Sequence, residues 1–84
     1  MNGRPSLSFV VEGAGCENCA ARVRAVLEPL VQVREILIDD DADIAVVTAE
    51  AADVTHADVE AALMRASEGS GHAYRVAPGS WRVG

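Results

Sequence analysis

The sequence predicts an α+β domain in which a four-stranded antiparallel sheet carries two helices on one face. Alternating apolar residues near the N-terminus predict a strand, and the three-and-four apolar spacing that follows predicts a helix. A second strand pattern follows this helix and completes the first half of the chain. The second half repeats the order of strand, helix and strand. An aspartate-rich turn joins the two halves. The resulting order, βαββαβ, is that of the ferredoxin-like open-faced sandwich.

Composition limits the chain to a small acidic domain of 84 residues, half of them hydrophobic. It carries 13 acidic and 7 basic residues, and its net charge of −6 argues against nucleic-acid binding, because phosphate contacts need a basic face. No stretch approaches the roughly 20 apolar residues of a membrane span, and no signal peptide is visible. We therefore expect a cytoplasmic protein whose two cysteines stay reduced.

The first strand is expected over residues 6–12, where apolar side chains alternate with polar ones. The first helix is expected from Asn18, a residue type that favours the N-cap position. Pro29 disfavours helical geometry at the residue before it, so we expect the helix to end or kink there. The buried stripe expected from helical spacing contains Val23, Val26, Leu27 and Leu30.

The middle of the chain predicts a β-hairpin. Residues 33–38 and 44–48 are rich in β-branched and apolar side chains, as strands are. The segment 39–43 between them contains four aspartates and is a turn by composition. A solvated hairpin tip is the simplest interpretation of these charges, and docking to a basic partner is the alternative.

The second helix is expected from Thr55, because Asp58 three residues later completes a capping box. Gly69 is a natural left-handed cap for its C-terminal end. A fourth strand is expected over residues 72–77.

The predicted domain spans residues 6–77. Residues 1–5 and 78–84 are expected to be flexible termini, and Trp81 in the second of them has no evident place in the core.

Both cysteines lie in one short loop, Gly13–Cys19, between the first strand and the first helix. Two thiols this close can bind one soft metal ion, because thiolates prefer Cu(I) and similar ions to harder cations. The positive end of the helix dipole favours the thiolate of Cys19. The same pair would also suit a small redox couple, so the spacing alone leaves both interpretations open.

The predicted topology decides which side chains can reach this loop. The loop, the turn 39–43 and the connection 68–72 all lie at one end of the sheet. His72 therefore can approach the cysteines, whereas His56 precedes the second helix at the opposite end.

The chain resembles the heavy-metal-associated domain family, the module of copper chaperones and of the N-terminal regions of metal-pumping P-type ATPases. The resemblance covers residues 6–76 and rests first on the pattern Gly-x-x-Cys-x-x-Cys in the first loop of a βαββαβ chain. Further matching positions are Val26, Leu27, Leu30, Val33, Ile36, Ile38 and Asp39.

This resemblance implies that Cys16 and Cys19 are metal ligands and that the function is metal binding and transfer, not catalysis. Cu(I) is the preferred ion, with Zn(II) and Hg(II) as alternatives. Gly15 supports this preference, because zinc-selective relatives often have a carboxylate directly before the first cysteine. The implied partner is another metal-binding domain, a P-type ATPase or a metallochaperone. The implied state is a monomer, with a metal-bridged dimer as the alternative.

Two further positions bear on the implied site. Ala14 stands where the family usually has a methionine packed beneath the loop, so we expect a loop that is more mobile or differently packed. His72 is the candidate third ligand, or a group whose charge tunes partner docking. The alternative is an exposed histidine on a glycine-rich loop.

Functions of other classes are less consistent with the sequence. A glutaredoxin-like dithiol oxidoreductase would place a proline opposite its active site in mid-chain, and no proline occurs between Pro29 and Pro78. A structural zinc site made of both cysteines and both histidines would need side chains from opposite ends of the fold. No nucleophile with a base, paired carboxylates or phosphate-binding loop indicates an enzyme. An interaction domain with incidental thiols is the remaining alternative.

Overall fold

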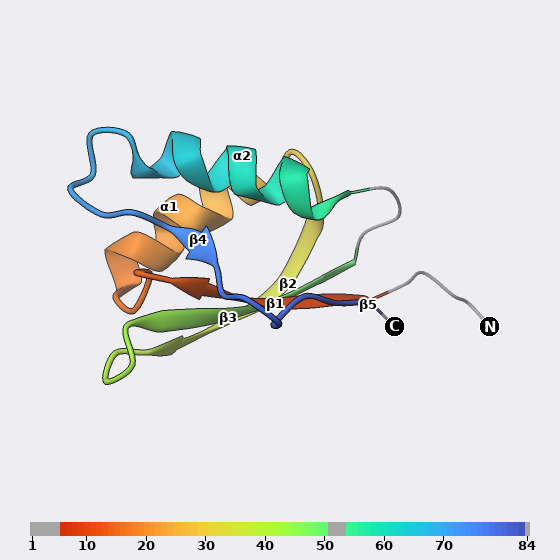
Figure 1. Ribbon diagram of the computed structural model, residues 1–84, viewed down its shortest axis with the longest axis horizontal. Coiled ribbons are helices and arrows are strands. Elements are labelled where there is room, and N and C mark those ends of the chain that lie inside the picture. The colour runs from red at the N-terminus through yellow and green to blue at the C-terminus, as the bar shows by residue number, and fades with distance from the viewer. Residues whose placement is uncertain (1–5, 51–53, 84) are drawn as a thin grey trace.

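A computed structural model describes residues 6–50 and 54–83 of the chain. The elements in chain order are β1 (Ser6–Glu12), α1 (Glu17–Leu27), β2 (Gln32–Asp39), β3 (Ile44–Glu50), α2 (His56–Ser67), β4 (Arg75–Val76) and β5 (Arg82–Val83). The two helices pack on one face of an antiparallel sheet, and no described element covers the opposite face (Figure 1). The predicted βαββαβ sandwich is confirmed, with one short strand added after it.

The sheet has the strand order β2-β3-β1-β4, and β5 also pairs with β1. Phe9 in β1 lies opposite Val47 of β3, and Val11 lies opposite Val76 of β4. Alternate residues of β1 are buried, as the sequence pattern predicted, and alternate residues of β3 are buried as well. Because β1 is held on both sides, the loop that follows it starts from a fixed position.

Aliphatic side chains form most of the core, because the chain has only one Phe, one Tyr and one Trp. Phe9 is fully buried at the centre of this core. Each fully buried aliphatic side chain contributes about 1.5–3 kcal/mol through removal of apolar surface from water. The buried positions of the two helices are Cys19, Ala20, Val23, Leu27, Val59, Ala62, Leu63 and Ala66.

The first helix ends at Leu27, as Pro29 predicted. The backbone N–H groups of Leu30 and Val31 both donate to the Leu27 carbonyl, at 2.8 and 2.9 Å, and this turn leads into β2. Leu30 therefore lies outside the helix and is 40% exposed, so its expected place in the buried stripe is wrong. Val31 is buried instead.

The second helix has the predicted caps. Thr55 Oγ1 accepts a hydrogen bond from the Asp58 backbone N–H at 3.1 Å, and Asp58 Oδ2 accepts one from the Thr55 N–H at 3.2 Å. Gly69 follows the helix with a φ of +73°, which glycine adopts without strain. The connection from α2 then returns to the end of the sheet where β1 ends.

The fourth strand is shorter than the predicted segment 72–77. Only Arg75–Val76 pairs with β1 as a strand, and the Ala77 N–H extends this contact by donating to the Val10 carbonyl at 2.8 Å. Tyr74, expected in that strand, lies before it, and its backbone N–H donates to Ser67 Oγ at 2.9 Å. The Tyr74 N–H is thus bonded to the Ser67 side chain at the end of α2 and not to a carbonyl of the sheet.

The described part of the C-terminal segment is also not the flexible terminus that the sequence predicted. Gly79 adopts a φ of +77° and turns the chain, and β5 then pairs with the first residues of β1. Ser80 Oγ accepts a hydrogen bond from the Val10 N–H at 3.1 Å and so bridges the gap between β4 and β5. Trp81 stacks on Phe9 with a ring separation of 5.3 Å, so it packs against the core. The other predicted flexible residues, 1–5 and 84, lie outside the described part.

Candidate metal centre

Three connections meet at one end of the domain, as the topology predicted. They are the loop after β1, the β2–β3 hairpin and the connection between α2 and β4 (Figure 1). His56 instead begins α2 at the opposite end, where its ring lies 5.2 Å from that of Trp81. The structure therefore separates His56 from the cysteine loop.

Cys16 is the N-cap of α1. Its backbone is extended, with φ −135° and ψ 162°, and its Sγ accepts a hydrogen bond from the Cys19 N–H at 3.2 Å. A helix leaves its first N–H groups without intrahelical partners, and here a sulfur satisfies one of them. The predicted N-cap at Asn18 is therefore wrong, because the helix already includes Asn18 in its first turn.

The two sulfur atoms lie together but in different surroundings. Cys16 Sγ and Cys19 Sγ are in hydrogen-bonding contact at 2.6 Å, and both residues are free thiols. Cys16 is exposed, whereas Cys19 is 2% exposed at the edge of the core. One thiol is thus open to solvent, and the other is held within the fold.

This difference in surroundings separates the acidities of the two thiols. Hydrogen bonds from the Cys19 side chain and backbone lower the pKa of Cys16. Burial raises the pKa of Cys19, and its contact with Cys16 raises it further. Cys16 is therefore the thiol that ionises first, which suits it to make the first bond to an incoming soft ion.

Tyr74 lies next to the buried thiol. The side chain is 3% exposed, and its hydroxyl makes no hydrogen bond of ordinary geometry within the described residues. Burial raises the pKa of Tyr74 to about 12, with a smaller contribution from the neighbouring Cys19. The tyrosine thus supplies a neutral, apolar wall beside Cys19 and an O–H group that is available to donate to a sulfur.

The cysteine loop packs between the α2–β4 connection and the β2–β3 hairpin. Gly13 has a φ of +81°, and a Cβ at this position would lie 2.7 Å from the Ala73 carbonyl oxygen. Ala14, at the position where a methionine was expected from the family pattern, is fully buried in the core. The loop is therefore packed by close backbone contacts, with only a methyl group beneath it.

His72 lies at the same end of the fold as the cysteines, but it does not form a cluster of ligand atoms with them. Its exposed ring stacks on that of Tyr74, with centroids 5.9 Å apart and planes 9° from parallel. Among the described residues, no group of three potential metal ligands within 4.8 Å contains His72 or the cysteines. Coordination by His72 stays a prediction.

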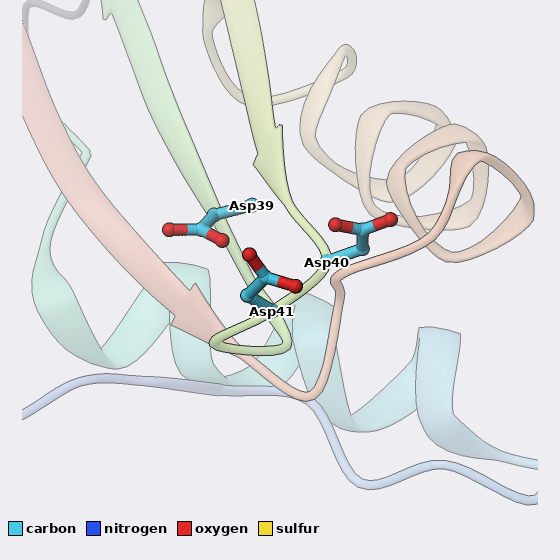
Figure 2. Close-up of side chains that lie close together, drawn as sticks. All are labelled: Asp39, Asp40 and Asp41. Atoms are coloured by element: carbon cyan, nitrogen blue, oxygen red, sulfur yellow. The ribbon is translucent and has the colours of Figure 1, made fainter.

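The described residues do hold one such group, at the tip of the β2–β3 hairpin. Figure 2 shows the exposed carboxylates of Asp39, Asp40 and Asp41, whose oxygens lie within 4.8 Å of one another. Asp39 Oδ1 accepts a hydrogen bond from the Ala42 N–H at 3.2 Å, which stabilises the turn itself. The cluster is consistent with the solvated hairpin tip that the sequence predicted.

Asp43 is the last residue of the turn before β3. No pattern in the sequence set it apart from the other aspartates of the turn. Its Oδ1 accepts a hydrogen bond from the Gly15 N–H at 3.0 Å, directly before Cys16. An acidic residue in a charged turn gives little sequence signal of such a contact. The glycine at position 15 is the one available clue, since it permits the close approach.

The model of the heavy-metal-associated domain family matches residues 8–67, which is well over half of the chain. The chain therefore belongs to the heavy-metal-associated domain family and is a heavy-metal-binding domain. No curated protein matches the chain significantly by sequence.

Several solved structures share the fold with this chain. One comes from work on crosstalk between Cu(I) and Zn(II) homeostasis; it is 21% identical, with a TM-score of 0.56, and the alignment covers 83% of this chain and 97% of that one. Another is oxidised MerP from Ralstonia metallidurans CH34, at 18% identity and a TM-score of 0.52, with 84% and 96% covered. No helix in the described residues is long and apolar enough to cross a membrane.

Proposed function

We propose that this domain binds a soft metal ion, Cu(I) by preference, between Cys16 and Cys19 and passes it to a second metal-binding domain. The observation that carries the proposal is the pairing of one exposed and one buried thiol, with sulfurs 2.6 Å apart, at the N-terminus of α1. Family membership independently supports heavy-metal binding by the loop that holds them.

The preference for Cu(I) follows from the donor set. Thiolates are soft ligands, and two of them suit an ion of low coordination number. Structural Zn(II) usually takes four ligands from the protein, and the described residues bring no third cysteine, histidine or carboxylate oxygen within 4.8 Å of both sulfurs. Hg(II) accepts the same pair of donors, so it and Zn(II) are the alternative ions.

Transfer follows from the different exposure of the two sulfurs. A thiolate of the partner can bind the ion on the open side next to Cys16 while Cys19 still holds it from within. The bond to Cys16 then breaks, a second thiolate of the partner binds the ion, and the bond to Cys19 breaks last. At each stage the ion keeps at least two sulfur ligands, so it never leaves as a hydrated ion.

The proposed setting is the cytoplasm, where thiols stay reduced. The partner is a metallochaperone or a P-type ATPase, and the domain itself is either a free chaperone or a metal-binding domain of such an ATPase. It acts as a carrier and not as an enzyme, in monomeric form. A metal-bridged dimer with four thiolates is the alternative assembly.

A dithiol oxidoreductase is the second candidate, because a lowered thiol pKa beside another thiol is also the pattern of a redox pair. The reduction potential separates the two functions. A glutaredoxin-like enzyme would have a potential of roughly −200 to −230 mV and would reduce disulfide substrates. A carrier would show no such turnover.

An anaerobic titration of the reduced protein with Cu(I), against a chromophoric Cu(I) chelator, tests the proposal. We expect tight one-to-one binding that is lost in Cys16→Ser and in Cys19→Ser and kept in the surface control Asp40→Asn. The same titration of His72→Ala decides whether that histidine contributes to affinity. A wild-type protein that cannot compete for Cu(I) would overturn the copper assignment, and Zn(II) and Hg(II) would then be titrated in the same way.

A further inference from the structure

Asp43 connects the β2–β3 hairpin to the cysteine loop, 28 residues earlier in the chain. Its backbone carbonyl accepts a hydrogen bond from the Gly13 N–H at 2.8 Å. Its side-chain Oδ1 accepts a second from the Gly15 N–H at 3.0 Å. One residue thus binds the loop backbone on both sides of Ala14.

The backbones of Gly15 and Asp43 lie so close together that there is no room for a side chain at position 15. A Cβ on Gly15 would lie 2.4 Å from Asp43 Cα and 2.9 Å from Asp43 Oδ1. Gly15 is buried, although Asp43 and Cys16 on either side of it are exposed. Only glycine allows the loop to lie directly on the hairpin.

Asp43 itself has the backbone geometry that this contact requires. Its φ is +56°, and it is the only residue other than glycine with a positive φ in the described part of the chain. Asp and Asn tolerate this left-handed conformation better than other side chains. The strain is modest, and the conformation lets the carbonyl and the carboxylate face the same loop.

The position of Gly15 matters because Cys16 follows it directly. The peptide between these two residues sets the extended backbone of Cys16, and that backbone aims Sγ at the first turn of α1 and at Cys19. The Gly15 N–H that Asp43 binds belongs to the preceding peptide, between Ala14 and Gly15. With only the Ala14 methyl beneath the loop, the hydrogen bonds of Asp43 to the Gly13 and Gly15 N–H groups hold the loop backbone that leads into Cys16.

We propose that Asp43 is a positioning residue for the metal centre: it fixes the loop backbone so that Cys16 is held within reach of Cys19 before an ion arrives. Holding both donors in place lowers the ordering cost of binding. Asp43 does not itself join the ligand set, since no group of three described ligand atoms within 4.8 Å combines it with both cysteines. The metal part of this inference rests on the proposed function.

A matched pair of variants separates the hydrogen bond from the charge. Asp43→Asn keeps an Oδ1 acceptor and tolerates the left-handed backbone but removes the charge. Asp43→Gly tolerates the same backbone and keeps the carbonyl but removes the side-chain acceptor. Asp40→Asn removes a charge from the same hairpin and serves as the control for net charge.

The first readout is hydrogen exchange of the Gly15 amide, measured by NMR on the reduced, metal-free protein. We expect exchange to be about tenfold faster in Asp43→Gly, since one hydrogen bond to a charged acceptor is lost, and to change less than about threefold in Asp43→Asn. Gly15→Ala is the second variant, because its Cβ forces the loop off the hairpin; the residue-15 amide is then expected to exchange faster as well. Unchanged exchange at residue 15 in Asp43→Gly or in Gly15→Ala would overturn the inference.

The second readout is Cu(I) affinity by chelator competition. We expect Asp43→Gly to weaken binding by up to about tenfold, because the loop must then be ordered on binding, while Asp43→Asn stays close to the wild type. Equal losses in Asp43→Asn and Asp43→Gly would show an effect of charge and overturn the positioning role. A wild-type protein that binds no Cu(I) would defeat the proposed function alone, since the exchange experiment needs no metal.

Discussion

The sulfur of Cys16 lies 2.6 Å from that of Cys19, yet only Cys16 is exposed to solvent. The same sulfur accepts the Cys19 backbone N–H, so one atom serves both as the cap of α1 and as the accessible thiol of the pair. The local fold of the helix and the chemistry of the site therefore depend on one another. This dependence leads to two predictions that separate reactivity from stability.

We expect Cys16 to be alkylated by iodoacetamide much faster than Cys19 in the reduced, metal-free protein. Cys16 is exposed and its pKa is lowered by the hydrogen bonds from Cys19, whereas burial raises the pKa of Cys19. A rate ratio of at least about tenfold at pH 7 is expected, because the thiolate is the reacting form. Mass spectrometry of the two labelled peptides measures it.

The control for this prediction is Cys19→Ala, which removes the side-chain hydrogen bond. The alkylation rate of Cys16 in this variant is expected to rise at a higher pH than in the wild type, because its pKa returns toward the ordinary value. Identical pH profiles in the two proteins would mean that Cys19 does not activate Cys16.

We expect Cys16→Ser and Cys16→Ala to differ in stability while both lose metal binding. Serine is among the preferred N-cap residues, so Cys16→Ser keeps an acceptor for the Cys19 N–H and a melting temperature at or above that of the wild type. Cys16→Ala leaves that N–H without its cap, and Tm is expected to fall by roughly 4–8 °C. Thermal unfolding of the reduced apo proteins, followed by circular dichroism, compares them. Equal Tm values for the two variants would contradict the role of Cys16 as the cap.

The raised pKa of Tyr74 predicts that the folded domain loses stability at high pH. Its pKa is raised from 10 in the unfolded chain to about 12 in the folded protein. The stabilisation of the folded state is therefore complete below pH 10 and is lost as the pH rises toward 12, because only the unfolded chain readily gives up the proton in this interval. The folding equilibrium constant is expected to fall by up to about tenfold per pH unit there. Urea unfolding at a series of pH values measures this slope.

Tyr74→Phe provides the comparison, because it keeps the ring beside Cys19 and removes the hydroxyl. The difference between the pH dependences of the two proteins measures what the Tyr74 hydroxyl contributes. The substitution itself is expected to cost little at pH 7, since the hydroxyl makes no ordinary hydrogen bond within the described residues. A wild type and a variant with the same pH dependence would show that Tyr74 ionises freely in the folded state.

The location of the two thiols was predictable because it depends on local patterns. The loop after an alternating strand, the spacing of Cys16 and Cys19 and the helix that follows are all read from adjacent residues. The capping box of Thr55 and Asp58 is equally local and was confirmed. The order of elements then places the hairpin and the α2–β4 connection at the same end.

The contacts around the thiols were not predictable in the same way, because they depend on register and on the path of distant loops. Asp43 reaches Gly15 only through its left-handed backbone and the exact end of the hairpin. Tyr74 lies beside Cys19 because β4 begins only at Arg75, one residue after it. Cys16 was overlooked as a cap because capping side chains are usually oxygen acceptors.

Trp81 was missed for another reason: its segment is short and follows a turn of Pro78 and Gly79, a pattern typical of a chain that leaves the domain. The structure instead returns the chain to β1 and stacks Trp81 on Phe9. A lone tryptophan in a domain poor in aromatic residues was the available signal, because such a side chain gains most when it covers a core.

We therefore expect Trp81→Ala to destabilise the domain without changing its metal affinity. The substitution removes the stacked pair with Phe9 and the edge contact with His56, and each aromatic pair contributes about 0.5–1.5 kcal/mol beyond its buried area. A loss of about 1–3 kcal/mol in the free energy of unfolding is expected from urea denaturation.

Val83→Ala is the matched control, because Val83 is 64% exposed in the same segment and its loss is expected to stay within about 0.5 kcal/mol. Since Trp81 packs against His56 at the start of α2, at the end of the fold opposite the cysteines, Cu(I) competition is expected to give the same affinity as the wild type. A stability unchanged by Trp81→Ala would mean that the C-terminal segment does not hold to the core in solution.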